Sequence, residues 1–389
     1  MRLFAFLSLS IALTVSIAGA QVIRELPPTT AFRAVSTGQS VAASGVAVGY
    51  TDQSHIAQPA LWRLSGSSYV REALPLPPGN SYGAANSIGP SGAIAGYLQP
   101  PDQSTATATL WTAPPGGAYA ATPLPTPIGS TLTGAYSINA TDSVGGFRET
   151  ASGNTNGVVW DPVIGSAYTA MVLPSLSGWV DSAATTINDN GDLAGYSFAA
   201  LGGPRGAVWE KTPSGYVARD VISAADDVVI TGMNNFGTGA AVVNGDEAGV
   251  MVFYEGDYYV GELNVPFGSS DSAANAVNNN DVIVGYVQDP TTLQGGNEAA
   301  LWMPGDDEWE LINLDDWLNR TAPPSLASWI LMEAFGVTDN GLVVGLGVRG
   351  GVERGFVLDV SSLVPEPTSA TLALLAGPML LVRRRRRRR

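Results

Sequence analysis

The sequence predicts an all-β fold, a repeat-built β-propeller of seven four-stranded blades. Three observations predict it: a unit that recurs every 49 residues, 46 glycines and 26 prolines beside a single lysine, and an amino-terminal segment that resembles the last strand of the unit. Glycine and proline penalise helix interiors and suit tight turns. The composition therefore argues against helical bundles and α/β folds.

The repeated unit has four strands, and the first three can be recognised as follows. A strand of small residues leads through an Asn/Gly turn into a strand that ends in Gly-aromatic, and a third strand ends in tryptophan. The Gly-aromatic element occurs at Gly49-Tyr50, Gly96-Tyr97, Gly146-Phe147, Gly195-Tyr196 and Gly285-Tyr286, with degenerate copies at Gly239 and Gly345-Leu346. The third strand ends at Trp62, Trp111, Trp160, Trp209, Phe253, Trp302 and Leu358.

A fourth strand alternates apolar and polar residues and ends in proline, as in Tyr69 to Pro75. Four strands in a period of about 40 to 50 residues are typical of a propeller blade. Small side chains suit the innermost strands, which converge on a channel, and the repeated Trp and Tyr should pack between blades. Residues 226–253 are too degenerate for strands to be placed, so six regular blades and one irregular segment remain an alternative.

The two ends of the repeat array predict how it closes. The last copy stops near Leu358 without its proline-ended strand, and Val22 to Pro27 resembles Val70 to Pro75. We therefore expect the amino-terminal strand to complete the seventh blade within a domain of residues 21–361. Such pairing closes a ring and removes sheet edges. An open array of β-modules is the competing architecture.

Residues 1–20 predict a secretory signal peptide. Arg2 precedes an apolar run, and Ala18-Gly19-Ala20 provides small residues for cleavage after Ala20. Residues 362–389 contain Pro365-Glu366-Pro367, an apolar segment from Thr368 to Val382 and seven arginines. Fifteen helical residues span roughly 22 Å against about 30 Å of hydrocarbon, so we expect a short transmembrane helix with its basic end in the cytoplasm.

Pro365, Glu366 and Pro367, the apolar segment and the arginine cluster together resemble the PEP-CTERM sorting signal of Gram-negative bacteria. This resemblance implies recognition by an exosortase in the inner membrane, export by the secretion machinery and an association with exopolysaccharide. A plain carboxy-terminal membrane anchor is the alternative. The repeats also resemble bacterial extracellular HAF repeats, although the histidine of that signature is absent from every copy.

Charge and composition exclude several functions. Eight of the 19 basic residues lie in the two terminal segments, which leaves 11 against 34 acidic residues and a formal charge of −23. Such a body repels nucleic acid and anionic lipid, so nucleic acid is not an expected partner. The absence of cysteine excludes disulfides, thiolate nucleophiles and zinc ribbons.

Few residues offer catalytic chemistry. His55 is the only histidine and is expected to be a solvated loop residue, which leaves no Ser-His-Asp triad. Asp181, Asp271 and Glu333 lie at or near inner strands, where paired carboxylates could cleave glycosides. They are more simply turn and strand-entry residues, and the acidic pairs Asp226-Asp227, Asp306-Asp307 and Asp315-Asp316 are expected on solvated loops.

Two segments, Asp189 to Asp192 and Asn278 to Asp281, contain fragments of calcium loops without the closing bidentate Glu. We expect hairpin turns there, with calcium as a minor hypothesis and no other cofactor. The sequence thus predicts an exported, non-enzymatic binding or structural propeller at the cell surface or in an extracellular matrix. A carboxylate-based glycosidase or lyase is the alternative.

Overall fold

The computed structural model describes residues 22–28, 35–53, 56–163, 167–199, 202–266, 268–288, 296–306, 308–322, 326 and 328–364. The expected signal peptide with Ala20, His55, and the expected sorting tail with Pro365, Glu366, Pro367 and its apolar helix lie outside these residues. Within the described ranges, no helix is long and apolar enough to cross a membrane.

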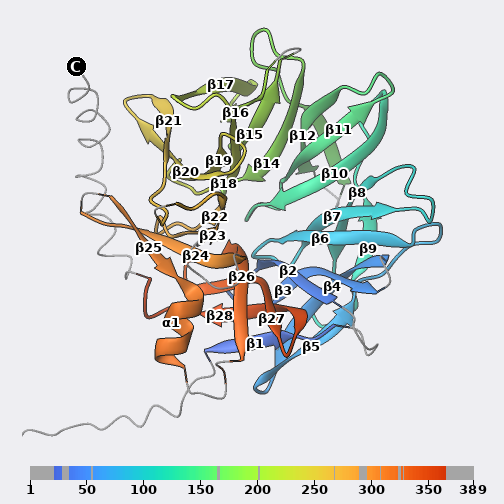
Figure 1. Cartoon of the computed structure of the whole chain (residues 1–389). Coiled ribbons are helices and arrows are strands. Elements are labelled where there is room, and N and C mark those ends of the chain that lie inside the picture. The colour runs from blue at the N-terminus through green and yellow to red at the C-terminus, as the bar shows by residue number, and fades with distance from the viewer. Residues whose placement is uncertain are drawn as a thin grey trace, which may run out of the picture.

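The described residues are all-β apart from one short helix, and five of their sheets have four antiparallel strands (Figure 1). One sheet contains β2 (Val35–Val41), β3 (Ala47–Gln53), β4 (Ile56–Ser65) and β5 (Ser68–Ala73). The next contains β6 (Tyr82–Ile88), β7 (Ile94–Gln99), β8 (Thr107–Thr112) and β9 (Ala120–Pro123). A third contains β10 (Ser130–Ile138), β11 (Val144–Thr150), β12 (Thr155–Val163) and β13 (Ala167–Val172).

Two more four-stranded sheets lie near the carboxyl end of the repeats. One contains β22 (Ser272–Val277), β23 (Ile283–Gln288), β24 (Asn297–Pro304) and β25 (Trp309–Asn313). The other is assembled from both ends of the chain, with the order β1-β28-β27-β26. Its strands are β1 (Ile23–Leu26), β26 (Trp329–Val337), β27 (Leu342–Arg349) and β28 (Val352–Asp359).

The remaining sheet has eight strands in two antiparallel sets of four. The first set is β14 (Asp181–Ile187), β15 (Leu193–Phe198), β16 (Pro204–Thr212) and β17 (Gly215–Ser223). The second is β18 (Val228–Met233), β19 (Gly239–Val243), β20 (Glu247–Tyr254) and β21 (Asp257–Glu262). Parallel pairing of β17 with β21, with Val221 opposite Tyr258, joins the two sets.

The segment that the sequence left unplaced is therefore regular, but its predicted alignment was wrong by two residues. Met251 pairs with Gly239, and this pair corresponds to Trp209 and Leu193 in the preceding set of strands. Met251 is fully buried, whereas Phe253 is 47% exposed. Ala241, opposite Ile230, takes the position predicted for Gly239. The 49-residue spacing from Phe253 to Trp302 is a coincidence that misled the alignment.

The prediction that the amino-terminal strand completes the last sheet is confirmed. β1 pairs with β28 in an antiparallel ladder that sets Ile23 opposite Leu358. The first strand of each four-stranded set contacts the first strand of the next, and β26 contacts β2. The sheets thus close into a ring around a centre, as Figure 1 shows, rather than forming an open array.

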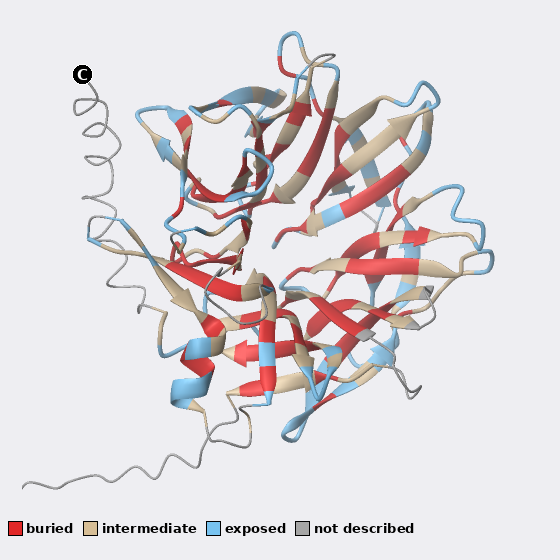
Figure 2. Ribbon diagram, in the orientation of Figure 1, coloured by how far each residue is buried: buried red, intermediate tan, exposed pale blue. Residues whose placement is uncertain are grey.

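The hydrophobic core is divided into clusters, each lying between one set of strands and the next (Figure 2). The repeated tryptophans are the largest fully buried side chains. Each Trp Nε1 also donates to a carbonyl in the segment after the preceding outer strand, at 2.7 to 3.0 Å: Trp62 to Pro27, Trp111 to Pro75, Trp160 to Pro125, Trp209 to Pro174 and Trp302 to Asn264. The tryptophans therefore pack between neighbouring sheets and hydrogen-bond across them, as their spacing suggested.

Every inner strand carries a β-bulge, which explains the glycine of the Gly-aromatic element. The bulged residues are Gln39, Asn86, Tyr136, Thr185, Thr231, Asn275 and Phe335. At the bulge the inner strand's carbonyl approaches the second strand so closely that a Cβ on Gly96 would lie 2.0 Å from the Ala84 oxygen. Only glycine fits at Gly96, whereas the corresponding position of β19 holds Ala241.

The insertion before Glu333 contains α1 (Leu314–Thr321), which the sequence did not predict. Asn313 caps it by accepting from the backbone N–H groups of Asp315 and Asp316. Asp315 also accepts from the backbone N–H of Leu331 at 3.0 Å. The expectation of a solvated loop for Asp315-Asp316 was therefore wrong, because these carboxylates belong to the first turn of a helix.

Candidate binding site

The ring has two ends, and each carries a different set of polar groups. At the hairpin end, tight turns join the first two strands of each set. At the entry end, the inner strands begin. The candidate residues predicted from the sequence are divided between the two ends.

A chain of asparagines links the turns at the hairpin end. The side-chain N–H of Asn139 donates to the carbonyl of Asn188, Asn188 to Asn234, Asn234 to Asn278, and Asn278 to Thr338. In each turn the same asparagine's Oδ1 accepts from its own backbone two or four residues later, as Asn234 does from Phe236 and Thr238. Asn340 extends the chain to the carbonyl of Ala43.

The two calcium-like fragments belong to this chain of turns. Asp189 accepts from the backbone N–H of Ala140, and Asn279 donates its own backbone N–H to Asp339 at 2.7 Å. Gly191 and Asp281 have the positive φ that such turns require, +88° and 59°. Among the described residues, no group of three or more acidic or histidine side chains is arranged to hold a metal ion.

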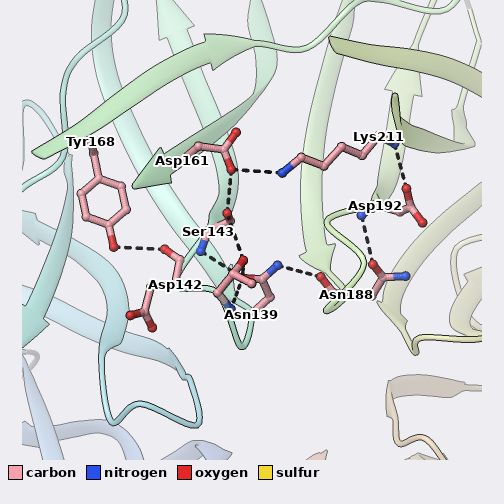
Figure 3. Close-up of polar contacts among 9 residues, drawn as sticks. Asn139, Asp142, Ser143, Asp161, Tyr168, Asn188, Asp192 and Lys211 are labelled. Atoms are coloured by element: carbon pink, nitrogen blue, oxygen red, sulfur yellow. Dashed lines mark hydrogen bonds and ion pairs between the residues drawn. The ribbon is translucent and has the colours of Figure 1, made fainter. Parts of the chain in front are cut away.

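Figure 3 shows how these turns connect to the outer strands. Ser143 donates to Asp161 at 2.6 Å, and Lys211 Nζ lies 3.5 Å from the same carboxylate. Lys211 also donates its backbone N–H to Asp192. Tyr168 donates to the carbonyl of Asp142. The polar groups in this region are therefore bonded to one another and serve the scaffold.

The three candidate carboxylates lie at the entry end, but the structure separates them into two roles. Asp181 accepts from the backbone N–H of Thr155 at 2.8 Å and joins neighbouring sheets. Asp271 accepts from the hydroxyl of Tyr286 at 2.9 Å. Glu333 accepts from the side-chain N–H of Asn275 at 2.9 Å. Asp181 is therefore structural, whereas Asp271 and Glu333 belong to one cluster.

Electrostatics couples the members of this cluster. Burial raises the pKa of Glu333, the negative charge of Asp271 raises it further, and the hydrogen bond from Asn275 lowers it. Burial, followed by the bond to Asp271 and the charges of Asp271, Glu333 and Asp246, raises the pKa of Tyr286. A carboxyl group with a raised pKa near a second carboxyl group is an arrangement that glycoside cleavage uses.

Further tyrosines gather on the first and second strands of other sheets. Burial raises the pKa of Tyr136 to about 12, and the nearby phenols of Tyr196 and Tyr97 contribute. Burial, and then the nearby phenol of Tyr50, raise the pKa of Tyr97. The ring of Tyr136 stacks on Phe147 with centroids 5.2 Å apart. The aromatic residues of the repeated element thus come together across several sheets.

An open groove of about 560 Å³ lies at the hairpin end between the β2–β5 and β6–β9 sheets, and it reaches the turn at Asp142. Arg63 Nε lies 3.4 Å from Glu72 on one wall, with both side chains almost half exposed. The Arg63 guanidinium also lies over the Tyr119 ring, 5.7 Å from its centroid. Ser91 donates to Asp142 at 2.6 Å on the other wall.

The comparisons with known proteins give a fold likeness only. No family model matches the chain, and no curated protein matches it. A solved structure of YCF48 bound to a D1 peptide has a TM-score of 0.48 and 15% identity, over 90% of this chain and 98% of the other. AofleA from Arthrobotrys oligospora has a TM-score of 0.42 and 12% identity, over 72% and 86%. Trypanosoma rangeli sialidase has a TM-score of 0.44 and 10% identity, over 87% and 56%.

Sequence reasoning missed the groove entirely. Some of its residues come from positions that vary between repeats, namely the residue after tryptophan and the loop between the third and fourth strands. Others lie on the fourth strand, as Glu72 does, or in the hairpin turns, as Ser91 and Asp142 do. Arg63 follows Trp62, where the next repeats have Thr112 and Asp161. A search for departures from the repeat at this position would have found the only arginine beside a repeat tryptophan.

Proposed function

We propose that this chain is an exported, seven-bladed β-propeller that binds extracellular polysaccharide or matrix without cleaving it. The eight-stranded sheet counts as two blades, because it consists of two antiparallel sets of four that share a single parallel pairing. The separate hydrophobic cluster between these two sets supports this count.

Export and sorting rest on the terminal segments. The signal-peptide pattern ending at Ala20 supports secretion, and Pro365, Glu366 and Pro367 with the basic tail support processing by an exosortase. Both termini of the propeller meet at the same sheet, since β1 pairs with β28. An anchor after residue 364 would therefore hold the ring by its closing sheet.

The groove between the first two sheets is the observation that carries the binding function. Most polar groups at the hairpin end are bonded within the scaffold, but Arg63, Glu72 and Asp142 present charge to an open hollow beside an aromatic ring. Pockets of this size with a few convergent polar groups are typical ligand sites. A binding role requires no catalytic group in the groove.

The test is a binding assay with the purified exported chain. Immobilised neutral and acidic bacterial polysaccharides are incubated with the protein, and retention is measured before and after prolonged incubation. We expect retention of the protein with no loss of polysaccharide chain length. Failure to bind any polysaccharide would contradict the proposal.

A glycoside-cleaving enzyme is the second candidate, and the cluster of Asp271, Glu333 and Tyr286 favours it. In this candidate Glu333, whose pKa is raised by burial, is the general acid that donates a proton to the glycosidic oxygen, and Asp271 is the general base that activates a water molecule for attack at the anomeric carbon. New reducing ends that disappear in both Glu333→Gln and Asp271→Asn would support this candidate over binding alone.

A further inference from the structure

We propose that the groove between the β2–β5 and β6–β9 sheets binds a neutral sugar unit that carries two adjacent hydroxyl groups. This inference rests on the proposed binding function and names its site and ligand class. The groove is lined by Arg63, Glu72, Ser91, Pro114, Tyr119 and Asp142, among others.

Two contacts hold Arg63 in place and leave its terminal N–H groups available to a ligand. Its Nε lies 3.4 Å from Glu72, and its guanidinium lies over the Tyr119 ring. Tyr119 is itself fixed, because its hydroxyl donates to the carbonyl of Gly92 at 2.8 Å. The described residues place no protein acceptor on the two terminal nitrogens of Arg63. A planar guanidinium with free N–H groups can donate to two neighbouring oxygens at once.

Acceptors face the same hollow. Glu72 offers the oxygen that does not meet Arg63, and Asp142 offers the oxygen that does not accept from Ser91. A sugar hydroxyl both accepts and donates, so a pair of adjacent hydroxyls can accept from Arg63 and donate to these carboxylates. An aliphatic ligand would satisfy neither half of this set, and an ionised carboxylate would satisfy only the donors of Arg63.

The groove also has apolar surface on which a sugar can lie. Pro114, Ala93 and the partly buried Tyr119 contribute carbon atoms to the lining. A pyranose ring has C–H groups on its faces and hydroxyls at its edge. It therefore suits a hollow in which apolar atoms and hydrogen-bonding groups stand side by side.

Charge selects neutral over acidic sugars. Two carboxylates and one guanidinium leave the groove with a net negative charge, on a body that is itself strongly acidic. A uronic acid would bring a third carboxylate into this space, where like charges repel. Neutral hexoses and deoxyhexoses carry no such penalty.

The protein contains a matched control for this site. Glu210 and Arg219 occupy the corresponding positions of β16 and β17, with the charges exchanged, and pair at 2.9 Å. The tyrosine of the next set of strands, Tyr258, contacts this pair, and its pKa is raised first by burial and then by the charge of Glu210. The polar groups of this second pair are thus engaged with one another, so it should not bind sugar.

The experiment is ligand-observed NMR titration of the exported chain. The probes are glucose, galactose, mannose, fucose and rhamnose, with glucuronic and galacturonic acids as acidic counterparts. We expect binding of at least one neutral sugar and much weaker binding of its acid. Arg63→Ala and Tyr119→Ala should weaken binding by about tenfold or more. Arg219→Ala should leave it unchanged.

Arg63→Lys is the conservative variant that separates loss of binding from misfolding. It keeps the charge but loses the planar guanidinium, so it should also weaken binding. Retained affinity in Arg63→Ala and Arg63→Lys, or equal affinity for the uronic acids, would overturn the inference. If the chain binds a polysaccharide but none of the neutral sugars, the groove inference fails and the binding function stands. If it binds neither, both fail.

Discussion

Trp62 Nε1 donates to the carbonyl oxygen of Pro27 at 2.7 Å, across 35 positions of sequence and across the closure of the ring. Pro27 follows β1, which belongs to the last sheet, whereas Trp62 belongs to the first. The same bond recurs between other neighbouring sheets, so the closure uses the ordinary junction of this fold. The stability of the whole ring should therefore depend on β1.

Leu26→Ala tests that dependence. Leu26 is fully buried among Trp62, Val344 and Val357, so its truncation should lower the free energy of unfolding by about 2–5 kcal/mol. Urea denaturation measures the loss. Val70→Ala, at a 56% exposed position of β5, is the control and should cost less than about 0.5 kcal/mol. Equal losses for the two variants would show that β1 does not hold the ring closed.

Gly96→Ala tests the bulge. An added Cβ would lie 2.0 Å from the carbonyl oxygen of Ala84, which is backbone and cannot move aside cheaply. We expect a loss of about 3 kcal/mol in the free energy of unfolding. Gly296→Ala meets no atom within 4 Å and provides the comparison. A mild effect at Gly96 would mean that the inner strand can straighten.

Asn234→Ala tests the chain of turns at the hairpin end. The buried Asn234 side chain accepts from Phe236 and Thr238 and donates to the Asn278 carbonyl and to Asp281. Leaving these partners unsatisfied should cost about 3 kcal/mol, against less than about 1 kcal/mol for exposed Asn190→Ala, which loses one bond. Chemical denaturation of both variants decides whether the linked turns stabilise the ring.

Glu333→Gln tests the electrostatic coupling at the entry end. Burial and Asp271 raise the pKa of Glu333 above its unfolded value, so its stabilising contribution is complete below the unfolded pKa and is lost as pH rises through the folded pKa. Gln keeps an acceptor for Asn275 without the charge. We expect the variant to melt at a higher temperature than the parent at pH 7, with a smaller difference at pH 4.

Thermal melts from pH 4 to pH 8 measure this effect. Glu353→Gln, which removes an exposed carboxylate from β28 of the same sheet, is the control. If Glu333→Gln and Glu353→Gln respond to pH in the same way, the carboxylates of Glu333 and Asp271 are not coupled through burial.

The sequence indicated most of the scaffold because the repeat imposes the same packing at every junction. The first four repeat tryptophans recur every 49 residues, and each one is buried in the same way, so their spacing reveals the sheets. Where the Trp position holds Met251, this signal is missing and the alignment slipped to Phe253. Strand register, not spacing, decided that position, because Met251 is fully buried and Phe253 is 47% exposed.

The sequence by itself determined the all-β class, the repeated unit and the pairing of the two chain ends, because these follow from local strand patterns and from a missing strand at one end. Only the tertiary structure decided which polar groups meet. Asn234 and Asn278, Asn275 and Glu333, and Arg63 and Tyr119 are brought together by the rotation from one sheet to the next. That rotation depends on the bulges and on packing at the junctions, which no strand pattern records.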